Sequence, residues 1–193
     1  MARFTTEERQ KSIISEAINI IHEGGYESLS IRELAKRVKI SEPAIYRHFL
    51  NKEDIILGIL ARISDFDQQL IESISKKNSP QDKLTEFICF HFEFLEKNRN
   101  MTSIIFSEEL FTQSAILKEK LMKILAHRQK LIIEIIDDAK DKRKVKDVDN
   151  SEISKIIIGM IRMTILEWNL SNFSFSLIKK GNSITKTFDK LIF

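Results

Sequence analysis

The sequence predicts an all-α protein of about nine helices, with a three-helix N-terminal domain followed by a larger helical domain. Only 5 of its 193 residues are glycine and 2 are proline, fewer than turn-rich β architectures usually need. Apolar residues recur at helical spacing, and the pattern predicts no strand. The expected helices span 6–23, 30–38, 41–49, 52–76, 80–98, 101–111, 113–142, 149–171 and 175–192.

Short capping motifs mark where the first helices are expected to begin. Thr5 with Glu8, and Ser30 with Glu33, each fit a capping box, in which two side chains satisfy backbone N–H groups at a helix start. Farther along, the stretch 141–149 is dense in charged residues and is expected to link the last two helices to the rest. These predictions rest on local signals. The chain has no internal repeat.

The composition is that of a folded protein outside the membrane. With 42% hydrophobic and 31% charged residues, the chain can bury a core and keep a charged surface. No apolar run approaches the roughly 18 residues of a membrane span, and the first residues lack an apolar signal region, so a cytoplasmic location is expected. Cys89 is the single cysteine, so neither an intrachain disulfide nor a cysteine-based metal site is expected.

Catalytic motifs are also missing from the sequence. It has no glycine loop for phosphates, no metal-binding pair of His and Glu, and no nucleophile motif around Cys89. We therefore expect neither an enzyme nor a bound cofactor. A helical adaptor that binds only proteins is an alternative that the composition leaves open.

Positive charge is concentrated in one short window, residues 30–52. This window holds six basic residues and two acidic ones, a net +4, whereas the whole chain carries +3 and the remainder therefore −1. Such a surface suits a polyanion, although a solvated helical surface is the plainer alternative. The basic residues are Arg32, Lys36, Arg37, Lys39, Arg47 and Lys52, and the acidic ones are Glu33 and Glu42.

The same window has the pattern of a helix-turn-helix. Ala35 is the small residue that lets a second helix cross closely, and Ser41 can cap that helix, with Pro43 tolerated in its first turn. Five apolar residues are placed to lock the two helices together: Leu34, Val38, Ile40, Ile45 and Phe49. The second helix then exposes Glu42, Pro43, Ala44, Tyr46, Arg47 and His48. This short helix is poor core material but suits the major groove of DNA.

Residues 30–54 resemble the signature of the tetracycline-repressor (TetR) family of bacterial transcription regulators. The matching residues are Ala35, Ile40, Ser41, Tyr46, Arg47, His48, Phe49, Lys52, Glu53 and Asp54. The resemblance implies a DNA-binding domain over residues 1–52 and a ligand-binding and dimerisation domain over 53–193. Lys39 departs from the signature, because it occupies a turn position where the family usually has glycine. A positive φ at this lysine would cost about 1 kcal/mol.

By position in that signature, nine residues are expected to contact DNA. Tyr46, His48 and Lys52 would bind phosphates, and Arg32 would read guanine. Arg47 could contact either a phosphate or a base, and the start of the second helix would face base edges. The full set is Ser30, Arg32, Ser41, Pro43, Ala44, Tyr46, Arg47, His48 and Lys52.

A symmetric dimer is expected, because one helix-turn-helix covers too few base pairs and two would occupy half-sites about 34–36 Å apart. In the family, the last two helices pack against their dyad mates as a four-helix bundle. The last predicted helix carries an apolar seam in steps of four and three residues, in which Gly181 would allow a partner to approach closely. The expected interface residues are Ile157, Met160, Thr164, Leu177, Gly181, Ile184, Phe188 and Leu191. The alternative is that this seam packs only within one chain.

The middle of the chain is rich in phenylalanine. The family resemblance implies a largely apolar ligand pocket there, with a few polar groups. The expected lining residues are Phe87, His91, Phe94, Phe106, Met122, Leu125, Met163 and Trp168, with His91 orienting the ligand. The alternative is that these residues form an ordinary core.

The function that follows is a homodimeric repressor. It would bind a palindromic double-stranded DNA operator with inverted-repeat half-sites and be released by an apolar or amphipathic small-molecule effector. No membrane partner is expected. An activator, or a DNA binder that needs no ligand, is a closer alternative than the protein-binding adaptor.

Overall fold

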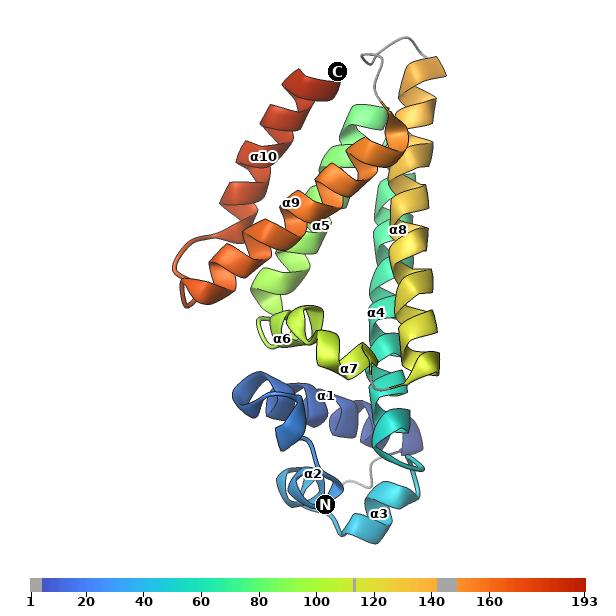
Figure 1. Ribbon diagram of the computed structural model, residues 1–193, viewed down its shortest axis with the longest axis vertical. Helices are drawn as coiled ribbons and strands as arrows, with labels where there is room; N and C mark the ends of the chain where they lie inside the picture. The colour runs from blue at the N-terminus through green and yellow to red at the C-terminus, as the bar shows by residue number, and fades with distance from the viewer. Residues whose placement is uncertain (1–4, 113, 142–148) are drawn as a thin grey trace. The chain divides into compact units, whose positions relative to one another are not determined.

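The computed structural model describes residues 5–112, 114–141 and 149–193, and all regular elements in these ranges are helices (Figure 1). The all-α prediction is therefore confirmed. The elements are α1 (Thr6–Gly24), η1 (Tyr26–Ser28), α2 (Ile31–Val38), α3 (Glu42–Tyr46), α4 (Lys52–Ser75), α5 (Pro80–Lys97), α6 (Met101–Phe106), α7 (Glu108–Thr112), α8 (Ala115–Asp141), α9 (Asn150–Leu170) and α10 (Leu177–Ile192). None of the helices described is both long and apolar enough to cross a membrane.

Two predicted helices end or break earlier than expected, and one predicted linker lies mostly outside the described residues. The helix expected over 101–111 is broken at Ser107, whose backbone (φ −85°, ψ 74°) leaves the helical region and separates α6 from α7. The helix expected over 41–49 ends at Tyr46, after which the N–H of His48 donates to the Ile45 carbonyl oxygen (2.9 Å) in a tighter turn. Of the linker expected over 141–149, residues 142–148 lie outside the described ranges.

The capping motifs at the first two helix starts behave differently. The Glu8 N–H donates to Thr5 Oγ1 (3.2 Å) and the Thr5 N–H donates to Glu8 Oε2 (2.7 Å), so this capping box is complete. The Glu33 N–H likewise donates to Ser30 Oγ (3.1 Å). The Glu33 carboxylate, however, pairs with Arg37 at 2.9 Å, because a guanidinium one turn away is a stronger partner than a backbone N–H.

The chain divides into two compact units, and neither is continuous in sequence. The first unit comprises Met1–Ser64 and Asn100–Met122, and the second comprises Asp65–Arg99 and Lys123–Phe193. This division differs from the predicted boundary after residue 52. It assigns the beginning of α4, all of α6 and α7, and the beginning of α8 to the unit that holds the helix-turn-helix.

Packing on α1 explains why α6 belongs to the first unit. Asn100 Nδ2 donates to Asn19 Oδ1 (2.7 Å), and His22 Nδ1 lies 2.8 Å from Ser103 Oγ. On α4, Gly58 allows a similarly close approach, since a Cβ there would lie 2.7 Å from the Cδ1 of Ile14. These contacts join α1, α4 and α6 into one core.

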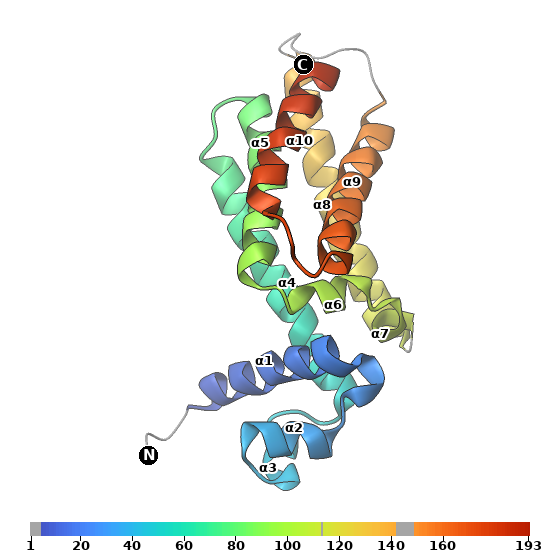
Figure 2. The ribbon, with the colours of Figure 1, turned by 90° about the vertical axis from the view of Figure 1, so that its left-hand side faces the viewer.

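The second unit is built on α5, which packs against α10 and α9 (Figure 2). Trp168 on α9 is fully buried, and its Nε1 donates to the Phe175 carbonyl oxygen (2.7 Å) in the turn before α10. This turn contains positive φ angles at Asn172 (53°) and Phe173 (60°). Other buried core residues of the unit are Leu84, Phe87, Ile88, Phe92, Leu95, Ile132, Ile136, Ile157 and Leu177.

Candidate functional site

The turn between α2 and α3 has the geometry of a helix-turn-helix. Lys39 is left-handed (φ 58°, ψ 45°), so the positive φ expected at this position is confirmed. The Ile40 N–H donates to the Ala35 carbonyl oxygen (3.0 Å), which closes the end of α2. Ala35 and Ile45 are both buried, as the crossing of α2 and α3 requires.

The residues expected to contact DNA belong to α2, α3, the start of α4 and their caps, except His48, which lies in the turn between α3 and α4. Six of them are exposed, namely Ser30, Arg32, Ser41, Pro43, Tyr46 and Arg47, whereas Ala44, His48 and Lys52 are half-buried. Tyr46 is 51% exposed, which is high for a large aromatic residue in a monomer and typical of a contact surface. The expected cap by Ser41 is wrong in one respect: within the described residues its hydroxyl makes no capping bond to α3. That hydroxyl therefore stays available to a partner.

Lys52 is held in place by Tyr26, a residue that the sequence analysis missed. The Lys52 Nζ lies 3.6 Å from the centroid of the Tyr26 ring and donates to the Tyr26 carbonyl oxygen (3.2 Å). Burial lowers the pKa of Lys52 from its ordinary value. No spacing rule links residues 26 and 52, so only the packing of η1 on α4 could reveal this pair. These two contacts hold the ammonium group beside η1.

Not every basic residue of the 30–52 window faces outward with a free charge. The guanidinium of Arg37 lies 2.7 Å from a Glu23 carboxylate oxygen, 2.9 Å from Glu33 and 3.5 Å from Glu16. Arg37 therefore joins α1 to α2 and adds little to the outer field. Among the residues that the structure describes, Arg32, Lys39 and Arg47 have no acidic partner, and they carry the outward positive charge.

A buried polar cluster lies in the second unit, among aromatic side chains. Asp67 on α4 and Arg128 on α8 pair at 2.8 Å, and the Arg128 guanidinium lies 5.3 Å from the centre of the Phe66 ring. Burial raises the pKa of Asp67, and the attraction of Arg128 only partly offsets that effect. The sequence analysis missed Asp67, although its position three and seven residues before the buried Leu70 and Ile74 puts it on an apolar helix face.

His91 on α5 belongs to the same cluster. Its ring lies 5.0 Å from Phe66 and 4.7 Å from Phe87, measured between ring centres. Nδ1 of His91 lies 2.7 Å from the Phe87 carbonyl oxygen, so Nδ1 carries the proton and Nε2 has a free lone pair. Burial, with a smaller effect from the charge of Arg128, lowers the pKa of His91 to about 3. His91 is therefore a neutral hydrogen-bond acceptor at neutral pH.

The residues expected to line an effector pocket occupy different places. His91 and Phe94 lie against Phe66, with ring centres 5.0 Å and 4.7 Å away, and Phe87 lies 4.7 Å from His91. Trp168 is buried beside Phe173 instead. Three of the expected lining residues, Met122, Leu125 and Met163, are exposed, and Met122 belongs with Phe106 to the first unit. The set as a whole stays a prediction.

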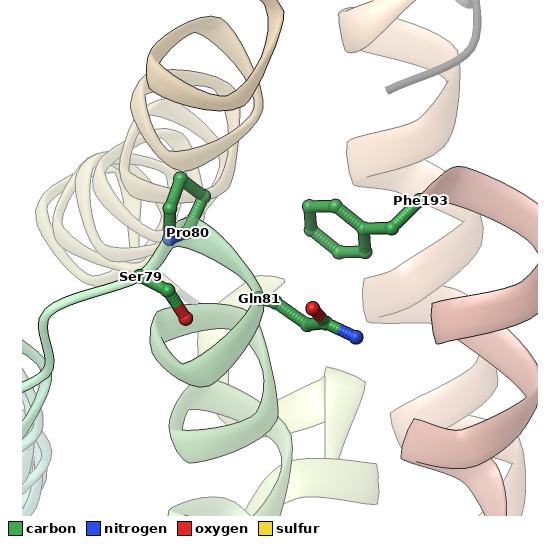
Figure 3. A pocket seen from close by; sticks show the side chains of 4 residues that line it. All are labelled: Ser79, Pro80, Gln81 and Phe193. Atoms are coloured by element: carbon green, nitrogen blue, oxygen red, sulfur yellow. The ribbon is translucent and has the colours of Figure 1, made fainter. Parts of the chain in front are cut away.

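A hollow of about 270 Å³ lies at the start of α5, where the last residue of the chain faces it (Figure 3). It is lined by Ser79, Pro80, Gln81 and Phe193, none of which belongs to the expected effector set. In the described part of the chain, no group of three His, Cys, Asp or Glu side chains could hold a metal ion.

The seam expected to form a dimer interface packs inside the chain for the most part. Ile157, Thr164, Leu177, Gly181 and Phe188 are buried in a single copy. A Cβ at Gly181 would lie 2.7 Å from Cδ2 of Phe92 on α5, so the glycine serves an intrachain contact. In a single copy these five residues therefore have little surface left for a partner, and the expected interface stays a prediction. Met160 and Ile184 are half-buried, and Leu191 is 58% exposed.

A different face of α9 is left exposed. Ile156, Met163 and Leu170 lie on it and are 55%, 54% and 73% exposed. Gly159 lies between them, and a Cβ added there would meet no atom within 4 Å. Their spacing of three, four and seven residues makes one stripe along the helix. We call these four residues the α9 stripe. Its helical spacing is visible in the sequence, but the buried face of α9 has the same spacing, so the sequence does not show which face is exposed.

Comparison with known proteins finds a matching family model for each of two parts of the chain. Residues 13–59 match the family described as bacterial regulatory proteins of the tetR family, and residues 60–190 match the YsiA-like protein C-terminal region. The fatty acid metabolism regulator protein of Bacillus subtilis is 26% identical over 174 residues, which cover 89% of each chain.

Solved structures agree with this assignment. The crystal structure of FadR from Bacillus subtilis in complex with stearoyl-CoA is 26% identical, with a TM-score of 0.80, and the match covers 91% of this chain and 95% of that one. The fatty acid degradation regulator FadR from Bacillus halodurans has the same fold, with a TM-score of 0.84 at 19% identity and coverage of 98% and 97%. On the helix-turn-helix geometry and these matches, the chain belongs to the TetR family of transcriptional regulators, which are DNA-binding proteins rather than enzymes, and has a YsiA-like C-terminal region.

Proposed function

We propose that the protein is a homodimeric repressor that binds an inverted-repeat operator and is released by a long-chain acyl-CoA. The observation that carries the DNA-binding part is the exposed face of α3. Tyr46 and Arg47 project from it, and the cations Arg32 and Lys39 nearby in sequence have no acidic partner in the described ranges. A short exposed helix of this kind, braced by a second one, fits the major groove.

The α9 stripe supports the homodimer. Its three apolar side chains leave a solvent-exposed stripe, and Gly159 in its middle would let another helix approach closely. A face that is identical on both copies can pack against itself around a twofold axis. We propose this face of α9 as the interface in place of the expected α10 seam.

The effector class is supported by the similar Bacillus subtilis regulator, which was crystallised with stearoyl-CoA. In this chain the rings of Phe66, Phe87 and Phe94 supply apolar and aromatic surface for an acyl chain. Arg128 supplies a cation beside them, which Asp67 neutralises in the free protein. A thioester or phosphate oxygen that replaced Asp67 would gain a charge-assisted hydrogen bond from Arg128.

DNA binding is tested by selection from a random DNA library with purified protein at near-physiological salt, followed by sequencing. We expect an enriched inverted repeat. Failure of a folded sample to enrich any motif would instead favour a non-specific binder or a protein-binding bundle.

The effector is tested on the selected operator by fluorescence anisotropy, with stearoyl-CoA, coenzyme A and stearate as separate probes. We expect release by stearoyl-CoA at concentrations at least tenfold below those of the other two. Arg128→Met should raise the half-release concentration about tenfold or more, since a charge-assisted bond is worth about 1.5–3 kcal/mol. Lys130→Met is the matched control, because Lys130 lies on the same helix, exposed and paired with Glu134. Equal release by both variants would place the effector elsewhere.

A further inference from the structure

Glu42 carries an unpaired carboxylate on α3, the helix proposed to enter the major groove and called here the recognition helix. It is the first residue of α3 and is exposed. Within the ranges that the structure describes, its side chain has neither a hydrogen bond nor an ion pair. Two other acidic groups of the same unit, close in sequence to α3, are engaged: the Leu50 N–H donates to Asp54 (2.9 Å), and Ser114 donates to Glu53.

An unpaired carboxylate on this surface weakens general DNA binding. The phosphates repel it, and a basic surface gains affinity from each cation that displaces counterions. Glu33, the other acidic residue of the 30–52 window, avoids this problem because Arg37 pairs with it at 2.9 Å. Glu42 has no such pairing, so it opposes DNA binding unless its carboxylate makes a bond that only one base offers.

Base chemistry identifies that bond. In the major groove, cytosine presents its N4 amino donor without an adjacent acceptor, whereas guanine presents only acceptors. Adenine also has an amino donor, but its N7 acceptor lies beside it and would repel the second oxygen of a carboxylate. Thymine offers an acceptor and a methyl group. A glutamate in the groove therefore favours cytosine.

The position of Glu42 brings it to base edges in the proposed complex. Residues at the start of a recognition helix are those that reach base edges in a helix-turn-helix. Glu42 precedes Tyr46 by one helical turn, so the two share a face of α3, and Tyr46 is exposed on it. Pro43 follows Glu42 and restricts the backbone at this point, which limits the positions open to the carboxylate.

We propose that Glu42 determines specificity by accepting a hydrogen bond from the N4 amino group of one cytosine in each half-site. The inference rests on the proposed function, since it requires α3 to enter the major groove. It assigns Glu42 a role that lowers affinity for DNA in general and raises the ratio of specific to non-specific binding.

The test repeats the library selection with the wild type, Glu42→Gln, Glu42→Ala and a control. Wild type should enrich one invariant cytosine per half-site at a position where Glu42→Gln enriches adenine, because glutamine pairs with adenine N6 and N7. Glu42→Ala should lose the preference at that position alone and bind random DNA more tightly. Glu7→Gln removes the same charge from α1, where Glu7 pairs with Lys11, and should select the wild-type sequence.

A chemical probe separates the base contact from a general charge effect. The cytosine is replaced by 2-pyrimidinone, which lacks the 4-amino group. Wild type should then lose about 5- to 150-fold in affinity, the usual range for one base contact, and Glu42→Ala should lose nothing further. Identical base preferences in wild type and both Glu42 variants would overturn the inference while leaving the proposed function intact. A wild type that selects no motif would overturn the proposed function and this inference with it.

Discussion

At the scale of single residues, His91 shows how burial sets chemistry. It is buried beside Phe66 and Phe87, and the bond to its one backbone partner, the Phe87 carbonyl oxygen, offsets only part of the cost of charging the ring. Its pKa falls from 6.5 to about 3, and the largest cause is burial. The neutral ring carries its proton on Nδ1, which donates to the Phe87 carbonyl oxygen. An effector can therefore meet His91 only as an acceptor.

This depressed pKa predicts that acid destabilises the fold through His91. Below about pH 6.5 the unfolded chain takes up a proton that the folded chain refuses until about pH 3. The free energy of unfolding should then fall by up to about 1.4 kcal/mol per pH unit in this window. Urea unfolding of wild type and His91→Phe between pH 7 and pH 4 measures the difference, and the variant should lack this part of the slope.

An NMR titration of the wild type provides a control that does not depend on the stability of a variant. The His91 ring signals should stay constant from pH 8 to pH 5. A midpoint near pH 6.5 would contradict the buried, neutral state.

At the scale of elements, the contact between α10 and α5 depends on one glycine. Phe92 fills the space that a side chain at position 181 would occupy, and Phe92 itself is fully buried. Glycine normally weakens a helix by about 1 kcal/mol relative to alanine. Its presence in the middle of α10 is explained by the close packing that it permits. Gly159 on α9 has no such neighbour among the residues that the structure describes.

The two glycines form a matched pair for mutation. Gly181→Ala should destabilise the protein by about 1–2 kcal/mol, because forced repacking against Phe92 outweighs the gain in helix propensity. Gly159→Ala should instead stabilise the isolated chain by up to about 1 kcal/mol. Urea unfolding at a fixed low protein concentration measures both effects, and a Gly181→Ala protein as stable as the wild type would rule out the close contact.

At the scale of the whole molecule, operator binding by the proposed homodimer depends on how two copies associate. The family places two helix-turn-helix units on two half-sites, so a protein that cannot dimerise loses most of its affinity. The α9 stripe is an exposed apolar surface on the pair of helices that the family resemblance assigns to the dimer. Met163 is its central side chain and was also expected in the effector pocket, so one substitution separates the two roles.

Met163→Glu should convert the dimer to monomers without unfolding it. A charge buried at a symmetric interface meets its own copy, and the desolvation cost opposes association. Sedimentation velocity should show the monomer, and operator affinity should fall about 100-fold or more. Gln69→Glu adds the same charge to an exposed position on α4 and should leave the dimer unchanged. A dimeric Met163→Glu protein with weakened stearoyl-CoA release would assign Met163 to the effector pocket instead.

Most of what the sequence determined by itself is local. The cap at Thr5 and the exposed face of α3 depend on residues within about one or two helical turns, so spacing alone predicts them. The left-handed turn at Lys39 was expected from the family resemblance, because the family usually has glycine at that position. The family signature extended these signals to a DNA-binding function. The break at Ser107 was missed, because no glycine or proline marks it.

The tertiary structure decided which helix faces meet. The sequence presents apolar faces on α9 and α10, but only packing shows that the α10 seam covers Phe92 and that the α9 stripe stays free. The same holds for the pair of Asp67 with Arg128, which lie 61 residues apart, and for Lys52 on Tyr26. Helical periodicity shows which face of a helix is apolar, but it does not show which other helix packs against that face. Such contacts are set by the packing of whole helices, so no local pattern encodes them.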